Sequence, residues 1–249
     1  MKKLLLSLLF LAANLYAGEI KIAVAANVTA AMEALQQEFA KTHPDTKVTV
    51  LLGSSGKLTA QIANGAPFDV FMSADMTFPH SLYEKKIAMN EPQVYAQGAL
   101  ALFSIKGFDL SKGISVVTDA GINKIAIANP KSAPYGKAAI EALTKTGLLE
   151  KVEGKFVYGE SITQAVQYTI TAAEIGFVAK SSMKSKDMIK YEEGKAYVDV
   201  DPSLYTPIDQ GVVMLKHGEN NSEAKAFYDF IMSKEAKAIF KAYGYLVHE

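Results

Sequence analysis

Apolar and polar positions along the chain follow a pattern typical of strands that alternate with helices. Short apolar runs rich in Ile and Val predict strands, and apolar residues recurring every three or four positions predict amphipathic helices. The first part of the chain predicts a strand at 19–25, a helix at 29–41, a strand at 46–52, a short helix at 58–63 and a strand at 68–73. This order favours a parallel sheet with right-handed crossovers and helices on both faces.

A second cycle of strands and helices begins after Gln97-Gly98. Strands are predicted at 99–103, 124–128, 155–158, 175–179 and 211–215, and helices at 134–145 and 161–171. Pro134 near the start of one helix and Gly147 just past its end are typical helix boundaries. A single long helix over 222–242, which Gly244 can end, closes the chain. Two cycles of similar size predict two similar α/β lobes.

The first residues predict export from the cytoplasm. Lys2 and Lys3 precede a largely apolar stretch up to Leu11, and the segment ends at Ala17 with a small residue. This is the pattern of a signal peptide over residues 1–17. The apolar run is short for a membrane-spanning helix, so an N-terminal anchor is the less favoured alternative. We therefore expect the mature protein to work in the periplasm.

Composition removes several classes of function. The chain carries 26 basic and 26 acidic side chains, and this zero net charge argues against a nucleic-acid partner, which would need a basic field. The absence of cysteine excludes disulfides, zinc–thiolate sites and cysteine nucleophiles. The four histidines are scattered without metal-ligand spacing, so we expect no cation site and no cofactor. A small anion remains a candidate ligand, because local dipoles suffice to bind it.

Four predicted helix starts could bind an anion. The first N–H groups of a helix have no partner within the helix and carry a partial positive charge, so they bind anions without help from Lys or Arg. These starts contain Asn27 and Ser55 in the first predicted lobe, and Tyr135 and Ile162 in the second. A cleft between the lobes could collect all four.

Each start, taken alone, also has a plain structural interpretation. Asn27 fits a simple N-cap, Tyr135 fits a core aromatic residue, and Ser161 with Gln164 fits a capping box. The segment 53–58 superficially resembles a nucleotide phosphate loop. Only two residues separate its glycines and no Ser or Thr follows its lysine, so the pattern excludes an ATP site and leaves a serine-glycine turn.

Four segments together resemble the periplasmic molybdate-binding proteins of ABC importers. They read IAVAANVTAAM, LLGSSGKLTAQIANGAPFDVFMSAD, ANPKSAPYGKAAIEAL and KAFYDFIMSKEAKAIFKAYGY. The resemblance implies a class II periplasmic-binding-protein fold, with one lobe from 18–97 and 207–249 and a second from 98–206. It also implies a monomer that closes over bare molybdate or tungstate and delivers it to an ABC permease in the inner membrane.

The same resemblance carries individual residues over to the site. Asn27 falls where the family has serine or asparagine, and Ser55 falls on the serine of the second loop. Tyr135 and Ile162 fall on positions that donate through the backbone. Ala179 stands where some members have a tyrosine hydroxyl, so that donor is absent from this chain.

Three other functions remain open beside molybdate binding. Another oxyanion such as sulfate would use the same kind of site. An amino-acid ligand would need a fixed pair of charges, and the four loops contain none. An exported hydrolase could use Ser54 or Ser55 as nucleophile, but neither lies in a G-x-S-x-G elbow and no histidine has a suggestive context. We therefore expect a binding protein and no enzyme.

Overall fold

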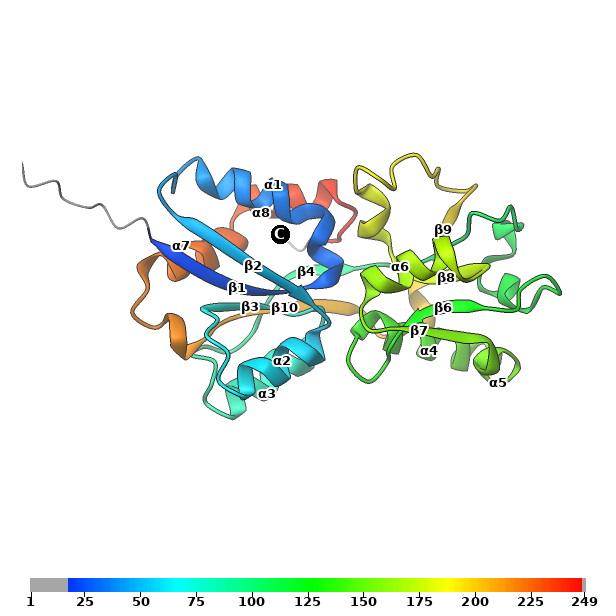
Figure 1. Ribbon diagram of the computed structural model, residues 1–249, viewed down its shortest axis with the longest axis horizontal. Helices are drawn as coiled ribbons and strands as arrows, with labels where there is room; N and C mark the ends of the chain where they lie inside the picture. Colours follow the sequence, from blue (N-terminus) through cyan, green and yellow to red (C-terminus); the bar gives the residue numbers. More distant parts are fainter. Residues whose placement is uncertain (1–17, 248–249) are drawn as a thin grey trace, which may run out of the picture.

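Two five-stranded sheets, each flanked by helices, form two lobes that lie side by side along the long axis (Figure 1). The computed structural model describes residues 18–247, and the predicted signal peptide lies outside them. The predicted two-lobe α/β architecture is confirmed. Parallel pairs are confined to β1 with β2 and β3 in the first lobe, and to β6 with β7 and β8 in the second; the remaining strand pairs are antiparallel.

The first lobe is built on a sheet with strand order β2-β1-β3-β10-β4. Its strands are β1 (Glu19–Ala25), β2 (Lys47–Gly53), β3 (Val70–Met72), β4 (Gln93–Gly98) and β10 (Ile208–Met214). Its helices are α1 (Thr29–Ala40), α2 (Ser55–Ala63), α3 (Thr77–Glu84), α7 (Ser222–Ile231) and α8 (Lys234–Ala242). Helices α1, α7 and α8 cover one face through Ile20, Ile22 and Val24, and α2 and α3 cover the other through Ala23 and Phe71 (Figure 1).

The second lobe is built on a sheet with strand order β7-β6-β8-β5-β9. Its strands are β5 (Leu100–Phe103), β6 (Ile125–Ala128), β7 (Phe156–Gly159), β8 (Ile175–Ala179) and β9 (Tyr197–Asp199). Its helices are α4 (Pro134–Lys145), the short α5 (Leu149–Val152) and α6 (Ile162–Thr171). Ile125 and Ile127 point to the α4 face, whereas Ala126 and Gly176 lie under Thr169 of α6. This alternation follows from the two-residue period of a strand.

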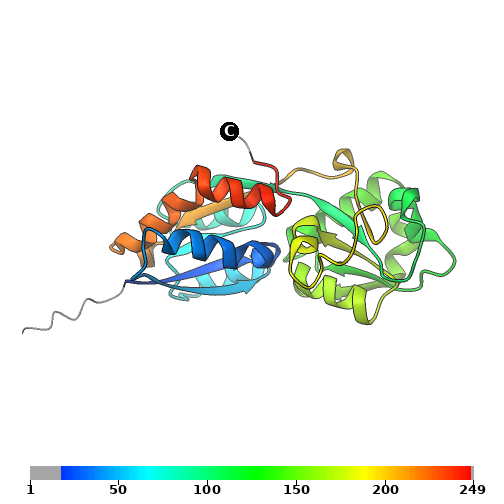
Figure 2. The same cartoon turned by 90° about the horizontal axis from the view of Figure 1, so that it is seen from above.

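The chain crosses between the lobes twice. It leaves the first sheet at Gly98, the end of β4, and enters the second at Leu100; it returns between the end of β9 and the start of β10 at Ile208. Figure 2 shows the two crossing segments running between the lobes, and Ile208 pairs with Gly98 in the antiparallel β4–β10 ladder. The two crossings therefore lie side by side.

Several boundaries agree with the sequence patterns and several do not. Strands β1 and β8 and helix α4 have the predicted bounds, and Gly147 and Gly244 follow their helices with positive φ. The prediction of one helix over 222–242 is wrong. The helix ends at Ile231, and Ser233 caps a new one by accepting from the N–H of Ala236, which interrupts an apolar pattern that is continuous in sequence.

The patterns also missed α3 and the strands β4 and β9. Helix α3 contains Pro79, a residue that breaks most helix patterns but is tolerated in the first turn. Strand β4 begins and nearly ends with glutamine, and β9 has only three residues, so neither forms a distinct apolar run.

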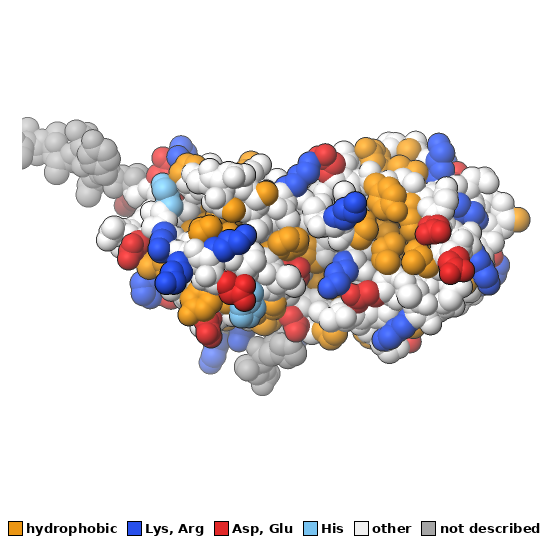
Figure 3. Space-filling model, turned by 90° about the horizontal axis from the view of Figure 1, so that it is seen from below, with side chains coloured by type: hydrophobic (Ala, Val, Ile, Leu, Met, Phe, Trp, Pro, Cys, Tyr) orange, Lys and Arg blue, Asp and Glu red, His pale blue; other side chains and the backbone are white. Residues whose placement is uncertain are grey.

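The face of the molecule drawn in Figure 3 carries charges of both signs. Figure 3 shows Lys and acidic side chains interspersed on both lobes, with a group of apolar side chains on the second lobe. Between residues 18 and 247 no helix has the length and apolar character needed to cross a membrane.

Candidate anion-binding site

A small cavity lies where the two lobes meet. It is lined by Ala25, Ala26, Asn27, Gly53, Ser54, Ser55, Ala74, Ala133, Pro134, Tyr135 and Ile162. All four residues predicted for the site are among them, so the structure brings the four helix starts together. The water-accessible volume is about 10 Å³, close to one water-sized sphere. None of the lining side chains carries a charge at neutral pH.

The cavity is positioned by the carboxyl ends of four parallel strands. Strands β1 and β2 lead into the 3₁₀ turn Ala26–Val28 and into α2, while β6 and β7 lead into α4 and α6. Ligands in open α/β sheets bind at this edge, because the loops and helix starts that follow the strands converge there. Each lobe thus presents two helix starts to the same point.

Backbone N–H groups at these starts are available to a ligand. Ser55 and Ile162 are the first residues of α2 and α6, and Tyr135 is the second residue of α4. No hydrogen-bond acceptor for their N–H groups is present among residues 18–247. The next N–H along α4, that of Gly136, is not available, since it donates to the carbonyl of Ala133 at 2.9 Å.

Two buried side-chain atoms at the cavity lack a partner. In the part of the chain that the structure describes, Asn27 Oδ1 and Ser54 Oγ are the buried side-chain polar atoms without a hydrogen bond, and both residues line this cavity. Leaving such a group unsatisfied costs about 1–3 kcal/mol. Ser55 Oγ accepts from the N–H of Ala74 at 2.9 Å, which leaves its hydrogen free to be donated. The cavity therefore holds unused hydrogen-bonding capacity.

Asn27 does not cap a helix. It lies inside the 3₁₀ turn Ala26–Val28, and no side chain caps this turn or α1. Its amide nitrogen instead donates to Gln210 Oε1 at 2.8 Å and to Tyr245 Oη at 2.9 Å. The N-cap interpretation of Asn27 is therefore wrong, because long-range partners hold the side chain. The predicted capping bond from the N–H of Gln164 to Ser161 Oγ is present at 3.3 Å.

Direct contacts hold the two lobes together around the cavity. The N–H of Gly56 donates to the carbonyl of Ser132 at 2.9 Å, and Thr163 Oγ1 donates to the carbonyl of Ala26 at 3.1 Å. An ion pair joins Lys57 to Glu160 at 2.6 Å. These bonds link α2 and the turn after β1 to the loop before α4 and to the start of α6, so the structure represents a closed arrangement of the lobes.

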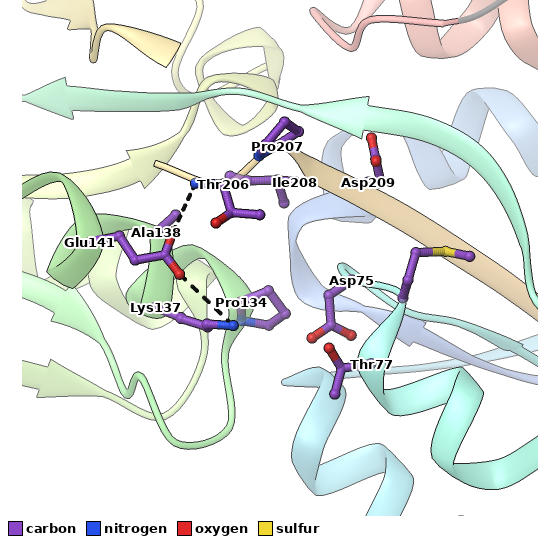
Figure 4. Close-up of a pocket in the computed structure, with 11 residues that line it drawn as sticks. Asp75, Thr77, Pro134, Lys137, Ala138, Glu141, Thr206, Pro207, Ile208 and Asp209 are labelled. Carbon is purple, nitrogen blue, oxygen red and sulfur yellow. Dashed lines mark hydrogen bonds and ion pairs between the residues drawn. The ribbon is translucent and has the colours of Figure 1, made fainter. Parts of the chain in front are cut away.

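A larger pocket between the lobes has the opposite chemistry. It has a volume of about 220 Å³ and opens beside Pro134, which lines both hollows. Figure 4 shows Asp75 and Thr77 facing it from the first lobe, and Lys137 paired with Glu141 on the other side. Burial raises the pKa of Asp75. Its carboxylates make this pocket a poor place for an anion, despite its larger size.

Ala179 and His217 do not line the cavity. Ala179 ends β8 as a buried core residue. His217 Nδ1 lies 2.8 Å from Asp69 Oδ1, so this histidine has a specific partner. No cluster of three or more metal-ligating side chains occurs within the described range.

The sequence patterns missed part of the site. The patterns place Ser54 only in a serine-glycine turn or, in the hydrolase alternative, as a nucleophile. They do not single out the buried residues behind Asn27. These are Tyr95, Gln210 and Tyr245, which lie far from Asn27 in sequence. No local signal marks them, because their contacts form only when distant stretches of the chain assemble into the first lobe.

Known proteins of one family are similar to this chain over nearly its whole length. The model of the family of bacterial extracellular solute-binding proteins matches residues 20–246. The chain belongs to this family. This solute-binding protein is 40% identical over 94% of its length to a protein from Azotobacter vinelandii named molybdate-binding protein ModA, of which 92% is covered. It is 41% identical over 92% of its length to the protein of the same name from Rhodobacter capsulatus, of which 89% is covered. The family-level resemblance seen in the sequence is thereby confirmed.

Solved structures agree with this placement. The periplasmic molybdate-binding protein of Azotobacter vinelandii superposes with a TM-score of 0.85 at 34% identity, covering 92% of this chain and all of that one. The sulfate-binding protein SubI of Mycobacterium tuberculosis superposes with a TM-score of 0.76 at 14% identity, covering 92% of this chain and 86% of that one. The second likeness shows a shared fold alone.

Proposed function

We propose that this solute-binding protein captures molybdate and tungstate in the periplasm, after export by residues 1–17, and delivers them as a monomer to an ABC permease. The observation that carries the proposal is the uncharged cavity, where two buried side-chain atoms and three helix N–H groups have no partner. The two molybdate-binding relatives, each about two-fifths identical over nearly the whole chain, support this choice of anion.

The donors proposed for the anion come from both lobes. Asn27, Ser54 and Ser55 contribute from the first lobe, and the backbone N–H groups of Tyr135 and Ile162 contribute from the second. Hydrogen bonds to a charged group contribute about 1.5–3 kcal/mol each. Five or six such bonds support tight binding after the costs of ordering and desolvation are subtracted.

Binding and closure are coupled in this account. Neither lobe alone supplies the whole donor set, so the anion favours the closed arrangement over an open one. Hinge motion at the two crossing segments would open the cleft for entry and release. The contacts from Gly56 to Ser132 and from Lys57 to Glu160 form only when the lobes meet, and they add to the stability of the closed state.

The donor-rich cavity explains which anions we expect it to reject. Molybdate and tungstate carry no proton near neutral pH, whereas phosphate retains at least one. A proton-bearing oxygen is a donor, and it is mismatched to the N–H and O–H groups that the proposed site directs at the anion. Sulfate also lacks a proton, so its exclusion depends on its smaller size.

Hydrolysis is the less favoured reading of the two serines. A serine nucleophile needs a base within hydrogen-bond reach. The residues that line the cavity supply no histidine, carboxylate or lysine, and Ser54 Oγ has no partner. An amino-acid ligand is disfavoured because the same lining offers no charge for its ammonium group.

Calorimetric titration of the purified exported protein tests the proposal. We expect molybdate and tungstate to bind at one site, sulfate to bind more weakly, and phosphate and amino acids to give no heat. Binding of an amino acid or of phosphate, with none for molybdate or tungstate, would overturn the proposal.

A further inference from the structure

A fully buried glutamine on a crossing strand connects the cavity residues of the two lobes. Gln210 lies on β10 with no exposed surface. Its Oε1 accepts from Asn27 Nδ2 at 2.8 Å and from Tyr95 Oη at 2.7 Å, and its Nε2 donates to Tyr135 Oη at 3.2 Å. Gly98 permits this approach, since a Cβ there would lie 2.0 Å from Tyr135 Oη and 2.7 Å from Gln210 Nε2.

The Asn27 amide has the wrong polarity for an anion in this arrangement. Its nitrogen uses both hydrogens, one on Gln210 Oε1 and one on Tyr245 Oη. The amide atom that remains without a partner is the carbonyl oxygen Oδ1, which can only accept. A dianion in the cavity needs a donor from Asn27 and is repelled by that oxygen.

Rotation of two amides resolves the conflict and gives up one hydrogen bond, the one from Asn27 Nδ2 to Tyr245 Oη. An amide turned by 180° exchanges O and N while its shape hardly changes. If both amides turn, Gln210 Nε2 donates to Asn27 Oδ1, and Gln210 Oε1 accepts from the Tyr135 hydroxyl. Asn27 Nδ2 is then released from both Gln210 and Tyr245. The Tyr245 hydroxyl, which donates to the backbone carbonyl of Asn27 at 2.8 Å, can turn its hydrogen to Asn27 Oδ1, because Ser181 Oγ also donates to that carbonyl. Burial raises the pKa of Tyr135 well above its usual range, so its hydroxyl keeps the proton that this arrangement requires.

Tyr95 completes the exchange. Its hydroxyl lies 2.7 Å from Gln210 Oε1 and 3.3 Å from the carbonyl of Ser73. After rotation it accepts from Gln210 Nε2 and donates to Ser73, so it keeps a partner in both arrangements. The network can therefore change polarity as a unit.

We propose that Gln210 is a positioning residue that sets which end of the Asn27 amide faces the cavity, so that binding of a bare oxyanion turns both amides together. This inference rests on the proposed function. Gln210 acts through Asn27 and stays behind the cavity, where it does not line the wall. It thereby determines whether the site offers a donor or an acceptor at this position.

A double-mutant cycle with molybdate tests this coupling. Gln210→Met keeps the length of the side chain and removes its polar atoms, and we expect it to raise the molybdate Kd about tenfold or more, the effect of one charge-assisted hydrogen bond. Asn27→Ser replaces the amide by a hydroxyl that rotates freely. In that background we expect Gln210→Met to change the Kd less than twofold. Equal effects in both backgrounds would show that Gln210 acts structurally, and would overturn the proposal.

Side-chain amide resonances give a second test that needs no variant. In the wild-type protein we expect the ¹⁵N–H₂ signals of both Asn27 and Gln210 to shift when molybdate is added. Gln36, whose Nε2 donates to the carbonyl of Val48 away from the cavity, serves as the control. A shift of Asn27 with an unchanged Gln210 signal would overturn the proposal even if Gln210→Met failed to fold.

The two levels of inference fail in different ways. Absence of molybdate binding by the wild-type protein contradicts the proposed function. Tight wild-type binding with additive effects in the cycle contradicts only the role of Gln210.

Discussion

Two neighbouring hollows between the lobes, which share Pro134, have opposite chemistry. The larger one is lined by the charged side chains of Asp75, Lys137, Glu141 and Asp209, whereas the smaller one has no charged side chain in its lining. Only the smaller one contains buried polar atoms without partners in the described part of the chain. We therefore assign the proposed anion site by its unused hydrogen-bonding capacity and not by its volume.

A new carboxylate should have the largest effect on this comparison. Ser54 occupies the N-cap position of α2, where aspartate is equally suitable, so Ser54→Asp should fold. Its charge near a dianion should weaken molybdate binding by at least about 3 kcal/mol, more than a hundredfold. Thr77→Asp adds the same charge at the first residue of α3 beside the larger pocket, and calorimetry should show its Kd nearly unchanged.

Separation of the lobes should have the next largest effect. A Cβ at Gly56 would lie 2.9 Å from Ser132 Cα, so Gly56→Val should hold the lobes apart. We expect about 2 kcal/mol of lost binding free energy, in the range of overpacking effects, and a larger radius of gyration with molybdate in X-ray scattering. Gly154→Ala is the control, because nothing lies within 4 Å of its Cβ. A Gly56→Val protein that binds molybdate like wild type would contradict the coupling of binding to lobe closure.

Ser54→Ala should change stability and binding in opposite directions. Ser54 Oγ has no partner, so its removal should leave the free energy of unfolding without ligand unchanged or raise it by about 1 kcal/mol. Molybdate binding should weaken about tenfold. Ser104→Ala should lower the free energy of unfolding and leave molybdate affinity unchanged, because Ser104 Oγ donates to the carbonyl of Glu174 at 2.6 Å and lies away from the cavity. Chemical denaturation and calorimetry measure both quantities, and a clearly destabilised Ser54→Ala protein with normal affinity would contradict the assignment.

The smallest effect is expected in the larger pocket. Burial raises the pKa of Asp75, so its ionised form is disfavoured in the folded state. This penalty is absent below about pH 4, the usual aspartate range, and is fully present above the raised pKa. Asp75→Asn should therefore increase stability at pH 7 by less than about 1 kcal/mol, lose that gain toward pH 4, and leave molybdate affinity unchanged. Thermal unfolding across this pH range measures the gain; a loss of molybdate affinity would place the anion nearer to Asp75.

Local signals explain what the sequence could predict. Strand β1 has a distinct apolar run, and α4 is bounded by Pro134 and Gly147, so their bounds were predicted correctly. The four helix starts were predicted for the same reason. Their convergence on one cavity follows from the carboxyl ends of β1, β2, β6 and β7, which the strand-helix order already implied.

Long-range contacts explain what the sequence could not predict. Asn27 and Gln210 are 183 positions apart, and Asn27 and Tyr245 are 218 apart. No spacing rule connects residues at such separations. The local sequence around Asn27 therefore predicts an N-cap and gives no sign of its partners Gln210 and Tyr245. The division of the last helix at Ser233 was missed because the apolar face continues across the break.

The position of the bound anion tests the central claim most directly. Tungsten scatters X-rays anomalously, so a crystal of the protein with tungstate locates the ion without assumptions about its ligands. We predict one strong peak in the small cavity, with Asn27, Ser54 and Ser55 on one side and the N–H groups of Tyr135 and Ile162 on the other. A peak in the larger pocket beside Asp75 and Lys137, or no ordered peak in a crystal grown with saturating tungstate, would contradict the account.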